Sequence, residues 1–265
     1  MASERSSYER IIELIFKEHY KPNVTSFVFE RTEIERAAAR LKVKTPKNVG
    51  DVLYSFRYRR LLPDSVRTKA PEGHERIILG TKKGEYKFVL TRQFNTAPNP
   101  DLAETKILDA TPEIISRYAL SDEQALLAKI RYNRLIDVFT GLTCYSMQNH
   151  LRTKILENVQ IETDELYVGI DKRGAHFVLP IQAKGFGERI GSVQIRQDFD
   201  LCADRFPDAI CRSIGAQFME DNVIALFEFE QAVPDIKIVA EKHYRLVSNN
   251  DLSKEELEQY VKRPE

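Results

Sequence analysis

The sequence has little cysteine, no long apolar run and no net charge. Its three cysteines, Cys144, Cys202 and Cys211, form no Cys-x-x-Cys pair. We therefore expect neither a disulfide framework nor a structural zinc site, and interpret them as small buried hydrophobic residues. No apolar stretch approaches the roughly 20 residues that span a bilayer. The first residues are charged early and lack a small-residue cleavage site, unlike a signal peptide. These absences predict a soluble cytoplasmic protein of prokaryotic type with no membrane partner.

Several catalytic signatures are also missing. The chain has no Gly-rich nucleotide-binding loop, no Gly-x-Ser-x-Gly elbow and no His-Glu-x-x-His sequence. We therefore expect no nucleotide cofactor.

The neutral total of 40 basic and 40 acidic residues conceals an uneven distribution. Residues 1–100 contain 20 Lys and Arg against 12 Asp and Glu, and residues 101–265 contain 20 against 28. The stretch 41–93 alone contains 13 basic and 5 acidic residues. Such a division suggests that one half binds a polyanion, with a chance fluctuation as the alternative.

The basic half has the element order of a winged helix-turn-helix. Amphipathic patterns predict helices over about 8–19, 32–41 and 49–61, with a short strand over 26–29. Two further strands flank the glycine-bounded turn 80–84 and read as a hairpin. In such a module the third helix and the wing tip contact DNA. The predicted DNA contacts of this half are Arg57, Arg59, Arg60, Lys82 and Lys83.

The rest of the chain alternates helices and strands. The proline-containing stretch from about Asn95 to Pro112 reads as a linker, so we expect a DNA-binding domain over 1–110 and a second domain over 111–265. A long helix is predicted from about Ser121 to Thr140. A polar segment, strands over 159–170 and 176–184, a helix over about 190–205 and further strands follow.

The predicted hairpin over residues 160–184 contains the candidate catalytic residues. If it is centred on Arg173, Asp164 faces Gln182 and Glu162 faces Lys184. Because side chains alternate along a strand, all four then project from one sheet face. Oxygen ligands beside an ammonium group suit Mg²⁺ and a water molecule next to a phosphodiester. The alternatives are a surface hairpin with a salt bridge, and a register shifted by one residue that brings Glu165 to the metal.

This arrangement resembles the PD-(D/E)XK nuclease core of many type II restriction endonucleases. The likeness covers about residues 121–240: a helix, Asp164 on one strand, a hairpin, Gln182-Ala-Lys184 on the next strand, and a polar helix. The resemblance implies a mixed sheet flanked by helices, in an α+β or α/β fold. It also implies Mg²⁺, with Mn²⁺ as a substitute, held by Asp164 and Gln182, while Lys184 serves the attacking water. Thr163 and Gln182 depart from the family pattern, and Glu162 or Glu165 would supply the missing anion.

Two polar groups near this hairpin are further candidates for DNA contacts. Gln194 and Gln197 lie one turn apart on the predicted helix, with a solvated helix face as the alternative. Asn149, His150 and Arg152 lie in the polar segment, with a structural turn as the alternative.

The function expected from these features is sequence-specific, Mg²⁺-dependent cleavage of double-stranded DNA by a restriction-type homodimer. One alternative is a non-catalytic winged-helix regulator with a decayed nuclease fold. The other is a repair or defence nuclease that recognises DNA structure or modified bases.

Overall fold

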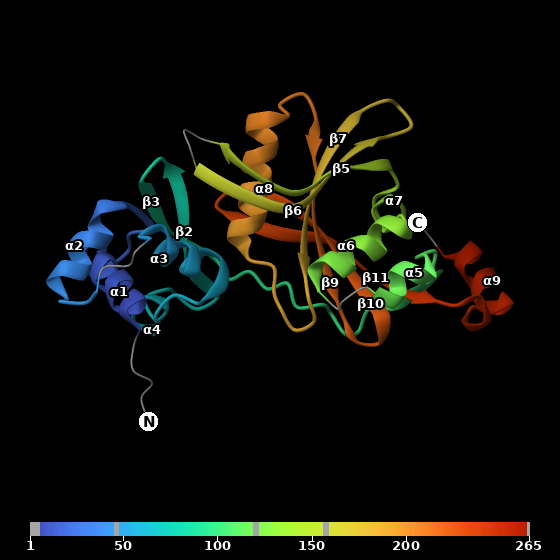
Figure 1. Ribbon diagram of the computed structural model, residues 1–265, viewed down its shortest axis with the longest axis horizontal. Coiled ribbons are helices and arrows are strands. Elements are labelled where there is room, and N and C mark those ends of the chain that lie inside the picture. Colours follow the sequence, from blue (N-terminus) through green and yellow to red (C-terminus); the bar gives the residue numbers. More distant parts are fainter. Residues whose placement is uncertain (1–5, 45–47, 119–121, 156–158, 264–265) are drawn as a thin grey trace.

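The computed structural model describes residues 6–44, 48–118, 122–155 and 159–263. Within them the chain is a mixed α+β protein with a three-stranded antiparallel sheet and an eight-stranded mixed sheet, as Figure 1 shows. We call residues 6–94 the N-terminal unit and residues 95–263 the C-terminal unit, in both cases only as far as they are described. None of the described helices is long and apolar enough to cross a membrane.

The N-terminal unit packs short helices against its antiparallel sheet. The side chain of Ser6 caps the first helix through a reciprocal pair of hydrogen bonds with Glu9. Apolar faces of the helices then bury Ile11, Ile15 and Leu53 against Phe88 of the sheet. The elements in chain order are α1 (Ser7–His19), β1 (Ser26–Glu30), α2 (Thr32–Arg40), α3 (Gly50–Tyr54), η1 (Ser55–Arg59), α4 (Asp64–Arg67), β2 (His74–Lys82) and β3 (Glu85–Arg92), with the sheet order β1-β3-β2.

The third predicted helix is not one α-helix. It is α-helical only over Gly50–Tyr54 and continues as the π-helical turn η1. Periodicity could not separate the two, because Val52, Leu53 and Phe56 are buried in both descriptions. The π-helical turn carries Arg57 and Arg59, two of the predicted DNA contacts.

The C-terminal unit is built on the larger sheet, whose order is β4-β11-β10-β9-β7-β6-β5, with β8 beside β7. Neighbours are antiparallel except β4 with β11, and β7 with β8 and β9. The strands are β4 (Glu104–Leu108), β5 (Thr143–Ile155), β6 (Val159–Ile170), β7 (His176–Lys184), β8 (Ile210–Cys211), β9 (Ser213–Phe218), β10 (Val223–Ala232) and β11 (Asp235–Val247). The stretch predicted as a linker thus contributes the strand β4, and the polar segment predicted after the long helix is the edge strand β5.

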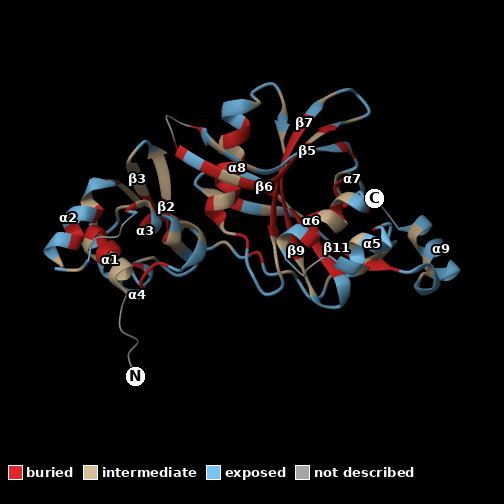
Figure 2. Ribbon diagram, in the orientation of Figure 1, coloured by how far each residue is buried: buried red, intermediate tan, exposed pale blue. Residues whose placement is uncertain are grey.

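Helices cover both faces of this sheet, as Figure 1 shows. Residues of α6 and α7 pack with one face and residues of α8 with the other, so buried positions run through strands and helices alike in Figure 2. The helices are α5 (Glu113–Tyr118), α6 (Glu123–Tyr132), α7 (Leu135–Thr140), α8 (Ser192–Arg205) and α9 (Lys254–Lys262), with short 3₁₀ turns at Glu220–Asn222 and Asn249–Asp251.

The single long helix expected before β5 is interrupted. Arg134 has a φ of +49° and separates α6 from α7, a backbone conformation that no helix interior accommodates. Ser121, the predicted start, lies outside the described residues, and the side chain of Asp122 caps α6 at the backbone N–H of Ala125.

The hairpin register predicted from its centre is correct over the paired part of β6 and β7. Glu165 faces Ile181 and Ile170 faces His176, which is the register centred on Arg173. Beyond Glu165 the ladder between β6 and β7 ends, while on its other edge β7 continues to pair with β9 from Ile181 to Lys184. Asp164 therefore lies where the ladder between β6 and β7 ends.

The alternation of side chains along β6 is broken once near Asp164. Ile161 and Leu166 pack in the same cluster with Leu201 of α8, although they are five residues apart and strict alternation would place them on opposite faces. Across the ladder from Asp164, His150 of β5 has a φ of +49°. Irregular strands of this kind redirect side chains, often beside functional sites.

A tight contact under the hairpin also depends on a residue without a side chain. Gly215 of β9 is the register partner of Gln182, and a Cβ there would lie 2.5 Å from Ile190 Cδ1 and 2.9 Å from the ring of Phe229. The sheet and the segment before α8 can approach this closely only because the position is glycine.

We therefore predict that Gly215→Ala lowers the free energy of unfolding by about 1–3 kcal/mol, the usual cost of overpacking a core. Urea denaturation measures this. Gly191→Ser is the control, because Gly191 has an ordinary φ of −84°, an added Cβ there would lie 3.6 Å from its nearest neighbouring atom, and serine is favoured at the helix N-cap that this residue occupies. Equal stability of Gly215→Ala and the wild type would contradict the packing described.

Candidate active site

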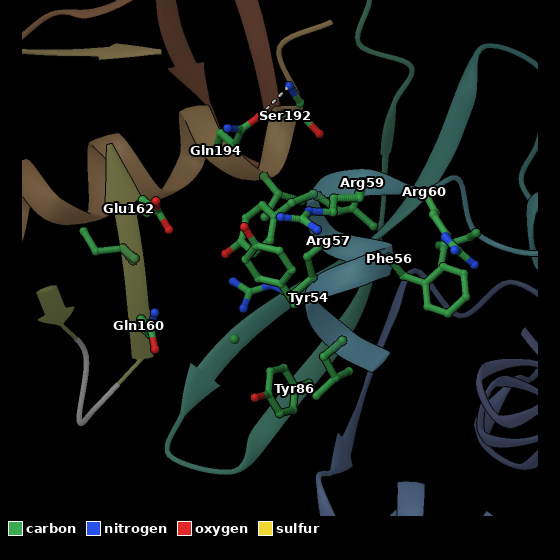
Figure 3. A pocket seen from close by; sticks show the side chains of 18 of the residues that line it. Tyr54, Phe56, Arg57, Arg59, Arg60, Tyr86, Gln160, Glu162, Ser192 and Gln194 are labelled. Carbon is green, nitrogen blue, oxygen red and sulfur yellow. Dashed lines mark hydrogen bonds between the residues drawn. The ribbon is translucent and has the colours of Figure 1, made fainter. Parts of the chain in front are cut away.

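A large groove lies between the two units. Its volume is about 1870 Å³, well above the roughly 300–1000 Å³ of pockets for small ligands. Figure 3 shows Tyr54 and Arg57 on one wall, Gln160 and Glu162 of β6 on the other, and Gln194 near the start of α8. Such a space suits a polymer better than a metabolite.

Asp164 lies in this groove, half-buried, at the point where β6 and β7 separate. Its Oδ2 accepts a hydrogen bond of 2.8 Å from the backbone N–H of Ala183. Burial raises the pKa of the Asp164 carboxyl, and the neighbouring carboxylates of Glu123 and Glu162 raise it further. The Ala183 N–H and the Lys184 ammonium oppose this shift. A positive charge delivered to Asp164 would relieve the excess of negative charge.

Lys184 stands between two of these acids. Its Nζ forms an ion pair with Glu123 at the start of α6 and donates a 2.8 Å hydrogen bond to the carbonyl of Ala183. The side chain is only 15% exposed, so its charge acts in a partly desolvated environment where electrostatic effects are stronger than in water.

Glu123 was not among the predicted site residues. In the sequence it is 41 residues from Asp164 and appears only as an acidic residue in the first turn of a helix, where acids are common. Its signal was therefore indistinguishable from ordinary capping. Only the folded sheet brings the start of α6 to the end of β7.

Gln182 does not take the role predicted for it. Its side chain is 1% exposed and both ends of its amide are engaged. Nε2 donates to Asp198 Oδ1 at 2.9 Å, and Oε1 accepts from Gln194 Nε2 at 3.0 Å. With these partners the amide is a structural link to α8, and its oxygen, which already accepts one hydrogen bond in a side chain that is almost fully buried, is poorly placed to bind a metal.

The buried acid behind Gln182 was also missed. Asp198 is 1% exposed, and its second oxygen is 3.1 Å from the hydroxyl of Ser213. Burial raises the pKa of Asp198 to about 8, although its hydrogen bonds oppose the shift. At neutral pH the carboxyl is largely protonated, and its second oxygen accepts the hydrogen bond from the Ser213 hydroxyl.

The two acids that were predicted to complete the metal site lie in different environments. Glu165 is fully buried on the other side of β6, bound to Arg131 and to Ser146. It faces Ile181 in the register centred on Arg173, so the shifted register that would bring Glu165 to the metal is wrong. Glu162 lines the groove and pairs with Arg152 at 3.0 Å and with His150 at 3.2 Å.

Most of the residues predicted to contact DNA line the groove. Those among its lining residues are Arg57, Arg59, Arg60, Lys82, Lys83, His150, Arg152 and Gln194. Asn149 instead binds Arg131 beside the buried Glu165. Gln197 is 4% exposed and contacts Tyr58 and the carbonyl of Gln160, so neither of these two has its side chain in the groove.

The groove lining is predominantly basic. Its described residues include twelve Lys and Arg and seven Asp and Glu. Arg59, Arg60, Lys82 and Lys83 are exposed on the N-terminal wall. The acids at the site, Asp164, Glu123 and Glu162, thus lie within a positive surface, an arrangement that attracts a polyanion.

The oxygen donors at the site fit Mg²⁺ in kind. Among the described residues, no group of three His, Cys, Asp or Glu side chains could hold a metal ion. Mg²⁺, however, is commonly bound by one or two carboxylates together with water and substrate phosphates. Asp164 would be one of those carboxylates, and Glu123, whose charge raises the pKa of the Asp164 carboxyl, would be the other. Gln182 does not fit as a ligand.

Comparison of the chain with protein-family models, with curated proteins and with solved structures finds no match.

The raised pKa of Asp198 predicts a pH dependence of stability. The folded state holds this proton up to about pH 8, whereas an unfolded aspartate loses it near pH 3.9. Between these values the wild type therefore loses stability as the pH rises, by about 1.4 kcal/mol per unit for a single group. Asp198→Asn removes the titration and keeps an acceptor for Gln182. Its amide N–H would face the Ser213 hydroxyl, which can accept as well as donate a hydrogen bond.

We expect Asp198→Asn to gain stability relative to the wild type on going from pH 5 to pH 8, as measured by urea denaturation at both values. Asp204→Asn, at the exposed end of the same helix, is the control and should show no such gain. A constant difference between Asp198→Asn and the wild type would contradict the protonated state assigned to Asp198.

Proposed function

We propose that the protein is a metal-dependent endonuclease that cleaves double-stranded DNA. One observation carries this proposal: Asp164, Glu123 and Lys184 meet within a polymer-sized groove whose opposite wall is basic. A carboxylate pair and an ammonium group are the donors that phosphodiester hydrolysis needs.

The order of the elements supports the same proposal. The succession α6, α7, β5, β6, β7, α8, β8, β9, with β9 parallel to β7, agrees with the helix, hairpin and following polar helix on which the resemblance to PD-(D/E)XK nucleases was based. In the N-terminal unit, α1, α2 and α3 with η1 and the sheet β1-β3-β2 with its β2–β3 hairpin agree with a winged helix-turn-helix, to which α4 is an addition.

In this proposal each residue has a defined task. Asp164 and Glu123 would hold Mg²⁺, which activates water and stabilises charge on the phosphate. Lys184 holds its ammonium beside Glu123 and the Ala183 carbonyl, and it would neutralise the charge that develops on a phosphate oxygen. The water would release a proton to solvent as its oxygen forms a new bond to phosphorus. The bond to the leaving ester oxygen would break, and that oxygen would take up a proton from solvent.

The basic wall would hold the duplex. Lys82 and Lys83 on the β2–β3 turn and Arg60 after η1 are exposed and line the groove, so they are available to phosphates and base edges. Because one site cuts one strand, cleavage of both strands calls for two copies, and we propose a homodimer as the cutting form. Mn²⁺ would replace Mg²⁺, since both prefer oxygen ligands.

A second candidate is a DNA-binding regulator without catalysis. Two observations favour it: the amide of Gln182 is engaged, and no group of three acids, histidines or cysteines among the described residues could hold a metal ion. This candidate predicts binding that is indifferent to Asp164→Asn and no cleavage with any divalent metal. A nuclease that recognises DNA structure or modified bases is a variant of the first proposal, and junction, flap and methylated substrates separate the two.

We predict that the wild type with Mg²⁺ converts a supercoiled plasmid to nicked and linear forms. The variants Lys184→Met and Asp164→Asn should each reduce the cleavage rate by at least about 100-fold, as expected for loss of a group that stabilises developing charge. Gel analysis of the products measures this. Lys172→Met, on the exposed turn between β6 and β7, is the control and should retain full activity. No cleavage across metals and modified or branched substrates would remove the nuclease proposal.

A separate prediction concerns affinity. Arg60→Ala should weaken binding of a cognate duplex in Ca²⁺ by about 1–3 kcal/mol if the residue reads a base. It should weaken all sequences equally, and reduce the salt dependence, if it contacts a phosphate. Fluorescence anisotropy at several salt concentrations separates these outcomes. Unchanged affinity in Arg60→Ala and Lys83→Ala alike would show that DNA does not occupy this wall.

A further inference from the structure

The helix α8 joins the N-terminal unit to both strands of the candidate site. Val193, Arg196 and Gln197 lie on the side that meets the N-terminal unit, at the three- and four-residue spacing of one helix face. Gln194 and Asp198, one turn apart, instead bind Gln182. One rigid element therefore touches the basic wall and the base of the site.

The contact with the basic wall is a hydrogen bond between two side chains. Tyr58 donates its hydroxyl to Gln197 Oε1 at 2.9 Å. Tyr58 belongs to the π-helical turn η1, and its neighbours in that turn are Arg57 and Arg59. Arg57 also stacks on the Tyr58 ring, with 5.0 Å between the guanidinium carbon and the ring centre. A movement of these arginines would thus also move the side chain of Tyr58.

From Gln197 the connection continues to the strand that carries Asp164. Gln197 Nε2 lies 3.4 Å from the carbonyl oxygen of Gln160, four residues before Asp164 on β6. On the neighbouring strand, Gln182 is held by α8 and precedes Lys184 by two residues. The strands that carry Asp164 and Lys184 are therefore each bound to α8 a few residues before those side chains.

The π-helical turn and the buried amide indicate that this contact does more than hold the two units together. π-helical turns are uncommon and concentrate at functional sites. Gln197 is 4% exposed, and a buried amide retained between two units specifies their relative position more sharply than an apolar contact would. The hydroxyl of Tyr58 is its only described side-chain partner across the boundary.

We propose that Tyr58 and Gln197 are positioning residues that couple occupation of the basic wall by DNA to the alignment of Asp164 and Lys184. This inference rests on the proposed nuclease function. When a duplex engages Arg57 and Arg59, the hydrogen bond transmits the position of η1 to α8, and α8 sets β6 and β7. DNA that binds without seating η1 leaves the site misaligned and is not cut.

A second link between the units provides a matched control. Arg196 of α8 donates to the hydroxyl of Thr91 at 3.0 Å, and that hydroxyl lies 3.0 Å from the carbonyl of Pro234. Thr91 is buried on β3 and does not belong to η1 or to the groove lining. Thr91→Val thus removes a hydroxyl from the same boundary without touching the proposed connection.

The test compares Tyr58→Phe and Thr91→Val in the full chain. With cleavable duplex and Mg²⁺, we expect Tyr58→Phe to lower kcat by about tenfold, within the range of coupling through packed networks, while KM changes less than about twofold. Thr91→Val should leave kcat unchanged even where its melting temperature falls as far as that of Tyr58→Phe. Equal effects of the two variants on kcat, or none from Tyr58→Phe, would overturn the proposal.

Hydrogen exchange gives a readout that needs no cleavage. With a 20-base-pair duplex and Ca²⁺, the wild type and Thr91→Val should gain protection both at 50–60 and at 159–170 and 176–184. Tyr58→Phe should gain it only at 50–60. If the wild type binds DNA and never cuts it, the nuclease proposal fails while this comparison still decides the coupling. Protection of β6 and β7 in Tyr58→Phe equal to that in the wild type would contradict it.

Discussion

The hydrogen bond from the backbone N–H of Ala183 to the carboxylate of Asp164 is the contact on which the candidate site depends. It spans the point where β6 and β7 separate, so the two strands stay joined through a side chain after their ladder ends. Without it, a half-buried carboxylate with a raised pKa would have no backbone donor to offset its desolvation. The same place sets the position of Lys184, which follows Ala183 directly and pairs with Glu123.

The sheet explains why so much charge gathers there. β7 lies between β6 and β9, and past the end of its ladder with β6 it continues to pair with β9 in parallel. Glu123 comes from the start of α6, whereas Gln194 and Asp198 of α8 engage Gln182. The acids and the ammonium group line the groove together with the two neutral amides, and the buried, protonated Asp198 supports Gln182 from behind. This separation keeps the charged groups accessible and the buried groups uncharged.

The sequence allowed some of this to be predicted. The hairpin register followed from the glycine turn and the placement of Arg173, because local pairing in a hairpin depends on residues close in the chain. The order of segments in the N-terminal unit followed from their periodicity, as did the mixed α+β class. Glu123 and Asp198 were missed, because their roles arise from helices that meet the hairpin only in the folded chain. Gln182 was assigned to the metal for the same reason: nothing local indicates that both ends of its amide are already bound.

In the proposed complex, duplex DNA lies in the basic groove with a phosphodiester at Asp164 and Lys184. A crystal structure of the protein with a 20-base-pair duplex and Ca²⁺ would show whether this is so. We expect a cation bound to Asp164, a backbone phosphate in contact with Lys184, and the opposite side of the duplex against η1 and the β2–β3 turn. A duplex bound away from this groove, or a cation bound elsewhere with Asp164 free of it, would contradict this placement of the DNA.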